Sequence, residues 1–158
     1  MTDQDRRFML RAIELAKLAV ETNSGGPFGC VIAKDGRIVG EGSNCVTTTN
    51  DPTAHAEVVA IRTACANLGT FQLEGCTIYT SCEPCPMCLG AIYWARPAAV
   101  FFAGTQNDAA AAGFDDQYFY DELAKPSNER DVKMANLLRD EAVAVFDQWL
   151  AKLDKTAY

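Results

Sequence analysis

Histidine is the residue that this sequence has least of, and its basic residues are fewer than its acidic ones. Histidine occurs once among 158 residues, at position 55, and 14 Lys and Arg residues stand against 21 Asp and Glu residues. The formal net charge is therefore −7. A protein that follows a phosphate backbone usually needs a basic surface to displace counterions. The charge balance thus disfavours nucleic acid as a partner and favours a small neutral substrate.

Long apolar runs are missing as well. The segment Met9–Val20 is mostly apolar, but three charged residues interrupt it: Arg11, Glu14 and Lys17. It therefore lacks the continuous apolar stretch of a secretory signal peptide. No run approaches the ~20 residues that cross a bilayer as a helix. We expect no membrane association and a location in the cytoplasm.

Cysteine, by contrast, is plentiful, with seven residues. In a reducing compartment clustered cysteines more often bind metal than form disulfides. The chain length and a hydrophobic content of 49% suit one globular domain, since a chain of this size buries roughly 68–70% of its unfolded surface. We therefore expect residues 1–158 to form a single domain that does not depend on metal for its core.

Hydrophobic periodicity and turn residues predict an α/β domain. Helices are expected at five segments: Asp5–Glu21, Pro52–Asn67 (with Asp51 as N-cap), Pro84–Ala95, Gln117–Lys125 and Arg139–Leu153, the last with Val143, Phe146 and Leu150 facing inward. Strands are expected at Phe28–Lys34, Arg37–Glu41, Cys76–Thr80, Ala98–Ala103 and Val132–Leu137. The dipeptide Asp35-Gly36 joins the first two strands as a hairpin. Strand–helix–strand units of this kind favour a sheet with parallel neighbours and helices on both faces.

The single histidine is accompanied by two cysteines with metal-ligand spacing. Cys85 and Cys88 stand three residues apart at a predicted helix start, so both thiols project from one face. The helix dipole favours anions there and lowers thiol pKa values. One imidazole and two thiolates suit zinc, and three protein ligands leave the fourth position open for water. We predict that one zinc ion binds to His55, Cys85 and Cys88 and acidifies that water.

Glu57 follows His55 by two residues, which turns its side chain about 200° around a helix from the histidine. A second ligand on that helix would be expected three or four residues away, so Glu57 is better placed to move the water's proton than to bind the metal. The alternative is a structural zinc with four ligands, in which Cys82 is the fourth because it stands three residues before Cys85.

Three segments resemble the cytidine deaminase superfamily: Asp51–Glu57 with His-Ala-Glu, Thr80–Cys88 with Pro-Cys-Pro-Met-Cys, and Gly90–Arg96. The pattern H-x-E…P-C-x-x-C is typical of zinc-dependent nucleobase deaminases. Within the superfamily, the sequences TSCEPCPMC and AGFDD are most similar to the branch of bacterial guanine deaminases. The resemblance implies a three-layer α/β/α cytidine deaminase-like fold with a mixed five-stranded sheet and one zinc per chain. It also implies a homodimer, with the C-terminal segment near the partner's site.

The same resemblance implies further site residues. Asn44 matches a position whose side-chain amide reads the base, and Phe28 matches an aromatic residue beside the pocket. Asp115 and Asp116 match an acidic pair over the site, with Asp116 facing the substrate as a second catalytic group, and Tyr158 matches a terminal aromatic that closes the pocket. From the residues alone each has a plainer interpretation, as a turn residue, a core aromatic, a solvated loop or a frayed terminus.

The reaction that the resemblance implies is hydrolytic deamination of guanine to xanthine and ammonia, by attack of zinc hydroxide with Glu57 as proton shuttle. The tRNA adenosine deaminases share both motifs, but binding an anticodon loop calls for basic groups and aromatic stacking around the mouth of the site. Cytosine, cytidine and pterin deaminases are further alternatives. A structural-zinc binding module without turnover is the alternative from a different class of protein.

Overall fold

The computed structural model describes residues 2–114 and 116–157, and the chain divides into two compact units, residues 1–116 and 117–158. The expected single domain over residues 1–158 stays a prediction. The first unit contains α1 (Asp3–Glu21), β1 (Gly29–Lys34), β2 (Arg37–Ser43), α2 (Val46–Thr49), α3 (Ala56–Leu68), β3 (Thr77–Cys82), α4 (Pro86–Ala95), β4 (Ala99–Gly104) and α5 (Gln106–Ala111).

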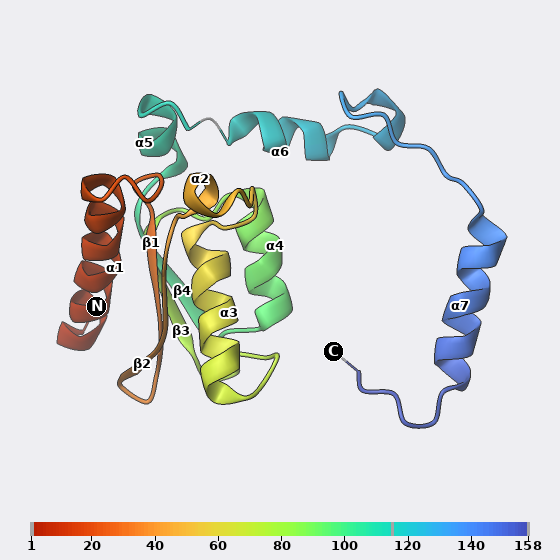
Figure 1. Ribbon diagram of the computed structural model, residues 1–158, viewed down its shortest axis with the longest axis horizontal. Helices are drawn as coiled ribbons and strands as arrows, with labels where there is room; N and C mark the ends of the chain where they lie inside the picture. Colours follow the sequence, from red (N-terminus) through yellow and green to blue (C-terminus); the bar gives the residue numbers. More distant parts are fainter. Residues whose placement is uncertain (1, 115, 158) are drawn as a thin grey trace. The chain divides into compact units, whose positions relative to one another are not determined.

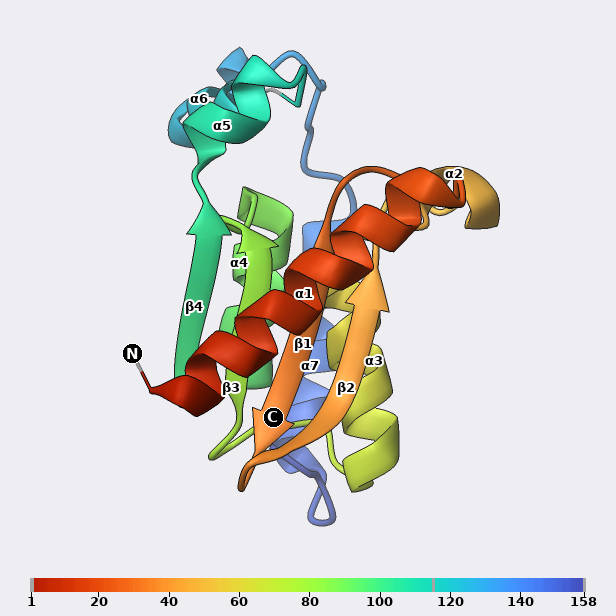
Figure 2. The same cartoon turned by 90° about the vertical axis from the view of Figure 1, so that its left-hand side faces the viewer.

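A mixed four-stranded sheet in the order β2-β1-β3-β4 forms the middle layer of the first unit. β1 pairs antiparallel with β2 and with β3, whereas β3 and β4 run parallel. α1 covers one face of the sheet, and α3 and α4 cover the other (Figure 1, Figure 2). The expected three-layer α/β/α arrangement with a mixed sheet is therefore confirmed.

The number of strands differs from the prediction, because the described residues form four strands rather than five. The segment Val132–Leu137 lies in the second unit and is not a strand. Its apolar side chains are exposed, Val132 by 73% and Leu137 by 83%. Its β-branched and apolar residues suggested a strand, but a strand is stable only beside a partner strand, and none of the described strands pairs with it.

Burial on both faces of β1 explains why two helical layers form. Cys30 and Ile32 point toward α3 and α4, whereas Val31 and Ala33 point toward α1, and all four are buried. Successive strand residues face opposite sides of a sheet. A strand that is apolar throughout therefore needs cover on both sides.

α3 packs closely on β2 because both elements present small residues at their contact. On β2 the contact residues are Gly40 and Gly42. A Cβ atom on Gly42 would lie 2.4 Å from the carbonyl oxygen of Ala56, and one on Gly40 would lie 2.6 Å from that of Ala60. The close approach fixes the position of the amino-terminal end of α3, where the single histidine stands.

The start of α3 lies four residues later than predicted. The helix was expected from Pro52 with Asp51 as its N-cap, but the observed N-cap is His55, in extended conformation. The Asp51 carboxylate instead accepts a hydrogen bond from the Thr53 N–H at 2.8 Å. Pro52 and Asp51 thus form a turn that leads into the helix, and the histidine is placed at the helix entry.

The second unit contains α6 (Gln117–Ala124), the 3-10 helix η1 (Ser127–Glu129) and α7 (Arg139–Ala151). None of its described residues is buried. Phe146 and Leu150, predicted to face inward on the last helix, are 66% and 69% exposed, so that prediction is wrong for the chain as described. No helix in either described part of the chain is long and apolar enough to span a membrane.

Candidate active site

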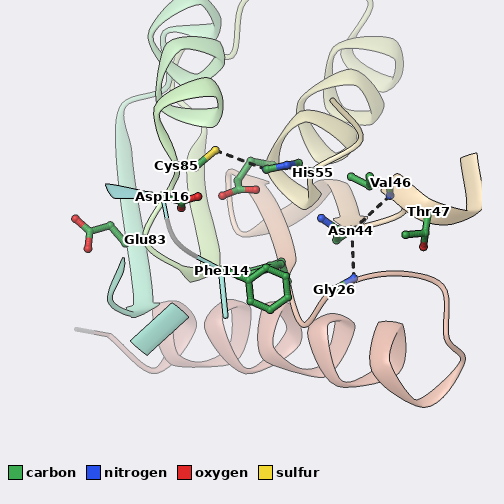
Figure 3. A pocket seen from close by; sticks show the side chains of 11 residues that line it. Gly26, Asn44, Val46, Thr47, His55, Glu83, Cys85, Phe114 and Asp116 are labelled. Carbon is green, nitrogen blue, oxygen red and sulfur yellow. Dashed lines mark hydrogen bonds between the residues drawn. The ribbon is translucent and has the colours of Figure 1, made fainter. Parts of the chain in front are cut away.

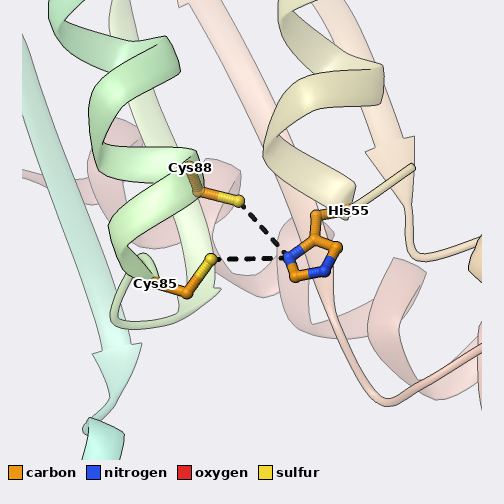
Figure 4. A group of neighbouring side chains, drawn as sticks. All are labelled: His55, Cys85 and Cys88. Carbon is orange, nitrogen blue, oxygen red and sulfur yellow. Dashed lines mark hydrogen bonds between the residues drawn. The ribbon is translucent and has the colours of Figure 1, made fainter. Parts of the chain in front are cut away.

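Three metal-ligand side chains meet at the starts of two helices. His55 is the N-cap of α3, Cys85 is the N-cap of α4, and Cys88 lies in the first turn of α4. The Nδ1 atom of His55 lies 3.6 Å from Sγ of Cys85 and 3.5 Å from Sγ of Cys88 (Figure 4). Among the described residues this is the one group of potential metal ligands within 4.8 Å of each other.

The spacing of these three atoms fits a tetrahedral zinc ion. With Zn–S bonds of ~2.3 Å and Zn–N bonds of ~2.0–2.1 Å, neighbouring nitrogen and sulfur ligands lie ~3.6 Å apart. Both measured distances match this value. The interaction between the two thiols lowers the pKa of Cys85 and raises that of Cys88. One thiol of the pair therefore ionises readily, and binding of zinc would displace the proton of the other.

Cys82 is not part of the ligand group. It ends β3, and its thiol donates a hydrogen bond to the carbonyl oxygen of Thr105 at 3.6 Å. Burial also raises the pKa of Cys82. The geometry therefore argues against a four-ligand structural site that includes Cys82.

Glu57 stands beside the ligands, in the first turn of α3. Its Oε2 atom accepts a hydrogen bond from the Cys88 thiol at 3.4 Å, and its side chain is buried, with the residue 6% exposed. Burial raises the pKa of Glu57, which favours a carboxyl group that can both take up and release a proton. The expected angle of 200° from His55 does not apply, because the histidine precedes the helix rather than lying in it.

A cavity of about 260 Å³ opens in front of these side chains (Figure 3). Its volume is near the lower end of small-molecule sites, which span ~300–1,000 Å³. It brings together six of the predicted site residues: Phe28, Asn44, His55, Glu57, Cys85 and Asp116. Cys88 is fully buried and does not line it. The predicted Asp115 and Tyr158 lie outside the described residues.

The lining also includes five residues that the sequence did not single out: Gly26, Val46, Thr47, Glu83 and Phe114. Two of them stand inside segments that carried the family resemblance. Glu83 directly precedes the Pro-Cys-Pro-Met-Cys motif, and Phe114 directly precedes the acidic pair. Their position beside a recognised motif is the signal by which the sequence could have identified these two residues.

Asn44 is buried, and two backbone N–H groups fix the orientation of its side-chain amide. Its Oδ1 atom accepts hydrogen bonds from the N–H of Gly26 at 3.2 Å and of Val46 at 3.4 Å (Figure 3). A Cβ atom on Gly25 would lie 2.0 Å from the backbone oxygen of Asn44, so the loop reaches this side chain only with glycine there. The amide nitrogen keeps its two donors for other partners.

Two aromatic rings form another part of the cavity wall. Phe28 and Phe114 pack edge to face, with ring centroids 4.9 Å apart and an interplanar angle of 82°. Such pairs stabilise beyond simple burial. Asp116 follows Phe114 by two residues and lines the same cavity. The hydrogen bond to Cys85 raises the pKa of His55, and the negative charge of Asp116 adds to that rise.

Comparisons with known proteins agree with this geometry. Residues 2–104 match the model of the cytidine and deoxycytidylate deaminase zinc-binding region. The guanine deaminase of Bacillus subtilis is 56% identical over 151 residues, which cover 96% of this chain and 97% of that protein. An X-ray structure of guanine deaminase from Bacillus subtilis superposes with a TM-score of 0.95 at 54% identity, covering 100% and 99% of the two chains. A tRNA-specific adenosine deaminase of Bacillus subtilis is 39% identical over 110 residues, 70% of this chain and 68% of that one.

Proposed function

Because the chain belongs to the cytidine and deoxycytidylate deaminase family, we propose that it catalyses the zinc-dependent hydrolytic deamination of guanine to xanthine and ammonia. The family match and the superposition on a solved structure confirm the resemblance and the cytidine deaminase-like fold that the motifs predicted. The observation that carries the proposal is a zinc-type ligand group that opens on a small cavity, with a buried glutamate beside it. Similarity over nearly the full length of a guanine deaminase supports guanine over the tRNA substrate of the more distant relative.

In this proposal His55 holds zinc through Nδ1, and Cys85 and Cys88 hold it as thiolates. Bound there, zinc supplies the nucleophile of the reaction, because it lowers the pKa of the water in its open position towards ~7. Both helix amino termini that meet at the group favour negative charge. The protein therefore stabilises the Cys85 thiolate before any substrate arrives, and its lowered pKa reflects this.

Glu57 moves the protons. It takes one proton from the attacking water and passes it to the ring nitrogen next to C2 of guanine, which makes C2 electrophilic. After the hydroxyl has added to C2, Glu57 takes the proton of that hydroxyl and passes it to the amino group. The C2–N bond then breaks as the C2=O bond forms, so that ammonia and xanthine are released. Burial of Glu57 supports this role, because its raised pKa brings proton uptake and release closer to neutral pH.

Asn44 binds the base in this proposal. Its oxygen is occupied by the N–H groups of Gly26 and Val46, so the amide presents donors to the cavity. Guanine offers the acceptors O6 and N7 on the edge remote from C2, whereas adenine offers an amino group in place of O6. The fixed amide orientation therefore supports an oxo-purine as the substrate.

The remaining site residues take roles in binding and proton transfer. We assign Phe28 to contact with the face or edge of the base, since its ring lines the cavity against Phe114. Asp116 contacts the substrate and assists Glu57 in protonating the leaving amine. Asp115 and Tyr158 are proposed substrate contacts on the strength of the family resemblance, and both lie outside the described residues.

We further propose that the protein is a cytoplasmic homodimer whose C-terminal segment lies near the partner's site. Exposed apolar side chains on α7, including Phe146 and Leu150, support a partner that covers them. All seven cysteines are free thiols, which supports a reducing compartment. In solution we expect a molar mass near twice that of the chain. Mixed dimers of tail-truncated and site-inactivated chains are expected to regain activity.

An ammonia-release panel tests the proposed reaction. The substrates are guanine, guanosine, adenine, cytosine, cytidine and a tRNA anticodon stem-loop. We expect guanine to be turned over with the highest kcat/KM and the stem-loop to be inert, because the protein carries a net charge of −7. Turnover of the stem-loop with guanine inert would overturn the choice of substrate.

A further inference from the structure

We propose that Glu83 is a positioning residue that ties the zinc-ligand loop to the cavity wall formed by Phe114 and Asp116. The inference rests on the proposed function, because it concerns how that cavity keeps the shape in which it binds a base. Glu83 lines the cavity but is not one of the potential ligands that meet at the metal group. Its contacts point instead to the segment that follows β4.

Glu83 makes two hydrogen bonds there, one from its backbone to the end of β4 and one through its side chain to the start of α5. Its backbone N–H donates to the carbonyl oxygen of Gly104 at 2.8 Å, and its Oε2 atom accepts from the backbone N–H of Gln106 at 3.0 Å. Gly104 ends β4 and Gln106 begins α5. Since Cys85 follows two residues after Glu83, one residue links a zinc ligand to the start of α5.

α5 depends on such a link because it is short. It has six residues, well below the ~12–15 at which an isolated helix becomes marginally stable. Its capping box, between Thr105 and Asp108, lies within the segment and does not attach it to the rest of the molecule. The thiol of Cys82 also reaches the Thr105 carbonyl, but at 3.6 Å it is a weak donor. The carboxylate of Glu83 is therefore the stronger side-chain tether.

α5 in turn carries the cavity wall. The backbone N–H of Phe114 donates to the carbonyl oxygen of Ala109, within α5, at 3.0 Å. Phe114 packs against Phe28, and Asp116 follows it into the cavity. Figure 3 places Glu83 and Asp116 on one side of the cavity, opposite Asn44. A displacement at the start of α5 would consequently move both wall residues away from the bound base.

The contact defines Glu83 as a hydrogen-bond acceptor rather than as a catalytic carboxylate. Glu57 and Asp116 already line the cavity as acidic residues. The interaction with a backbone N–H needs an acceptor of the right reach, which glutamine also provides. Aspartate keeps the charge but is one methylene shorter, so it loses the contact.

Three variants and one control test this assignment. Glu83→Ala and Glu83→Asp remove the tether, Glu83→Gln keeps it, and Glu74→Ala changes an exposed glutamate in the loop before β3. We expect the Ala and Asp variants to raise both the KM for guanine and the inhibition constant of the product xanthine by about two- to tenfold, the range of one ordinary hydrogen bond. Zinc content stays at one per chain, kcat falls less than KM rises, and the Gln and control variants behave as wild type.

Hydrogen exchange of the backbone amides gives a readout that does not need turnover. Exchange over residues 106–114 is expected to accelerate in the Ala and Asp variants and to stay at the wild-type rate with Gln. Unchanged constants and exchange in the Ala and Asp variants would overturn the proposal, and so would a Gln variant as impaired as Asp. If the wild type releases no ammonia from guanine, the proposed function fails, and the exchange pattern still decides the role of Glu83. If Ala does not fold, the Asp and Gln pair decides alone.

Discussion

Replacing Glu57 by glutamine removes the proton carrier from the site while keeping the size and shape of the side chain. The residue is 6% exposed and its Oε2 atom lies 3.4 Å from the Cys88 sulfur, so no bulk water replaces it in a variant of the same volume. An amide does not take up a proton at neutral pH. The substitution therefore isolates proton transfer from packing and from metal binding.

The expected loss follows from the number of transfers that Glu57 performs. General acid–base catalysis contributes ~10²–10⁴-fold, which corresponds to about 2.7–5.4 kcal/mol of activation free energy. In the proposed reaction Glu57 acts on the attacking water, on the ring nitrogen and on the leaving amine. We therefore expect kcat to fall by about 10⁴-fold or more, with a KM for guanine within a few-fold of the wild type.

The assay combines ammonia release with measurement of zinc content and thermal unfolding. The Gln variant should bind one zinc per chain and unfold at the wild-type temperature or above, because a buried carboxylate has been replaced by a neutral group. Glu57→Asp, which keeps the carboxylate but shortens its reach, should fall between the two. A Gln variant within tenfold of wild-type kcat would refute the proton-shuttle role, and loss of zinc in that variant would identify Glu57 as a ligand.

Three further predictions concern the metal site, an ion pair and a close contact. Cys82→Ser is expected to retain zinc and Cys88→Ser to lose it, as measured by metal analysis after gel filtration; the reverse would support a structural site. Hydrogen bonds from Arg11, at 2.8 and 3.0 Å, lower the pKa of Glu41 in the folded protein. This pair therefore stabilises the fold fully at pH values above the unfolded pKa of ~4.3. The stabilisation is lost as the pH falls through the lower pKa of the folded state. Glu41→Gln should therefore cost about 1 kcal/mol at pH 7 and nothing at pH 2, by urea unfolding at both pH values; an equal cost at both would contradict the ionic origin. Gly42→Ala places a Cβ atom 2.4 Å from a backbone oxygen of α3. We expect the free energy of unfolding to fall by about 1–3 kcal/mol and zinc to bind more weakly. Wild-type stability in this variant would show that α3 can move aside.

Local sequence signals were sufficient for much of the fold. Asp35 and Gly36 both have positive φ, 48° and 76°, as the predicted two-residue hairpin turn requires. The apolar run of β1 forms a buried strand with helices on both sides of the sheet, as its composition predicts. Such signals depend on neighbouring residues and on periodicity, so they are readable without knowledge of distant contacts.

The predictions of secondary structure were wrong where contacts between residues distant in the sequence determine the local structure. Pro52 and Asp51 have the chemistry of a helix start, yet α3 begins at Ala56, where the glycines of β2 admit its first turn. The segment Val132–Leu137 has apolar residues suited to a strand but lacks a neighbouring strand among those described. In both cases the local preference was outweighed by packing or by the absence of a partner.

The chemistry of the site can be read from the amino-acid sequence, because the donor atoms of His55 and of the Cys85–Cys88 pair suit zinc whatever the surrounding shape. Tertiary structure decided what that chemistry acts on. The orientation of the Asn44 amide depends on backbone N–H groups from the loop before β1 and from the start of α2. The wall that includes Phe114 depends on a hydrogen bond between Glu83 and α5 across 23 residues of sequence. Ligand identity is a property of individual side chains, whereas substrate choice is a property of a cavity, which exists only after the chain has folded.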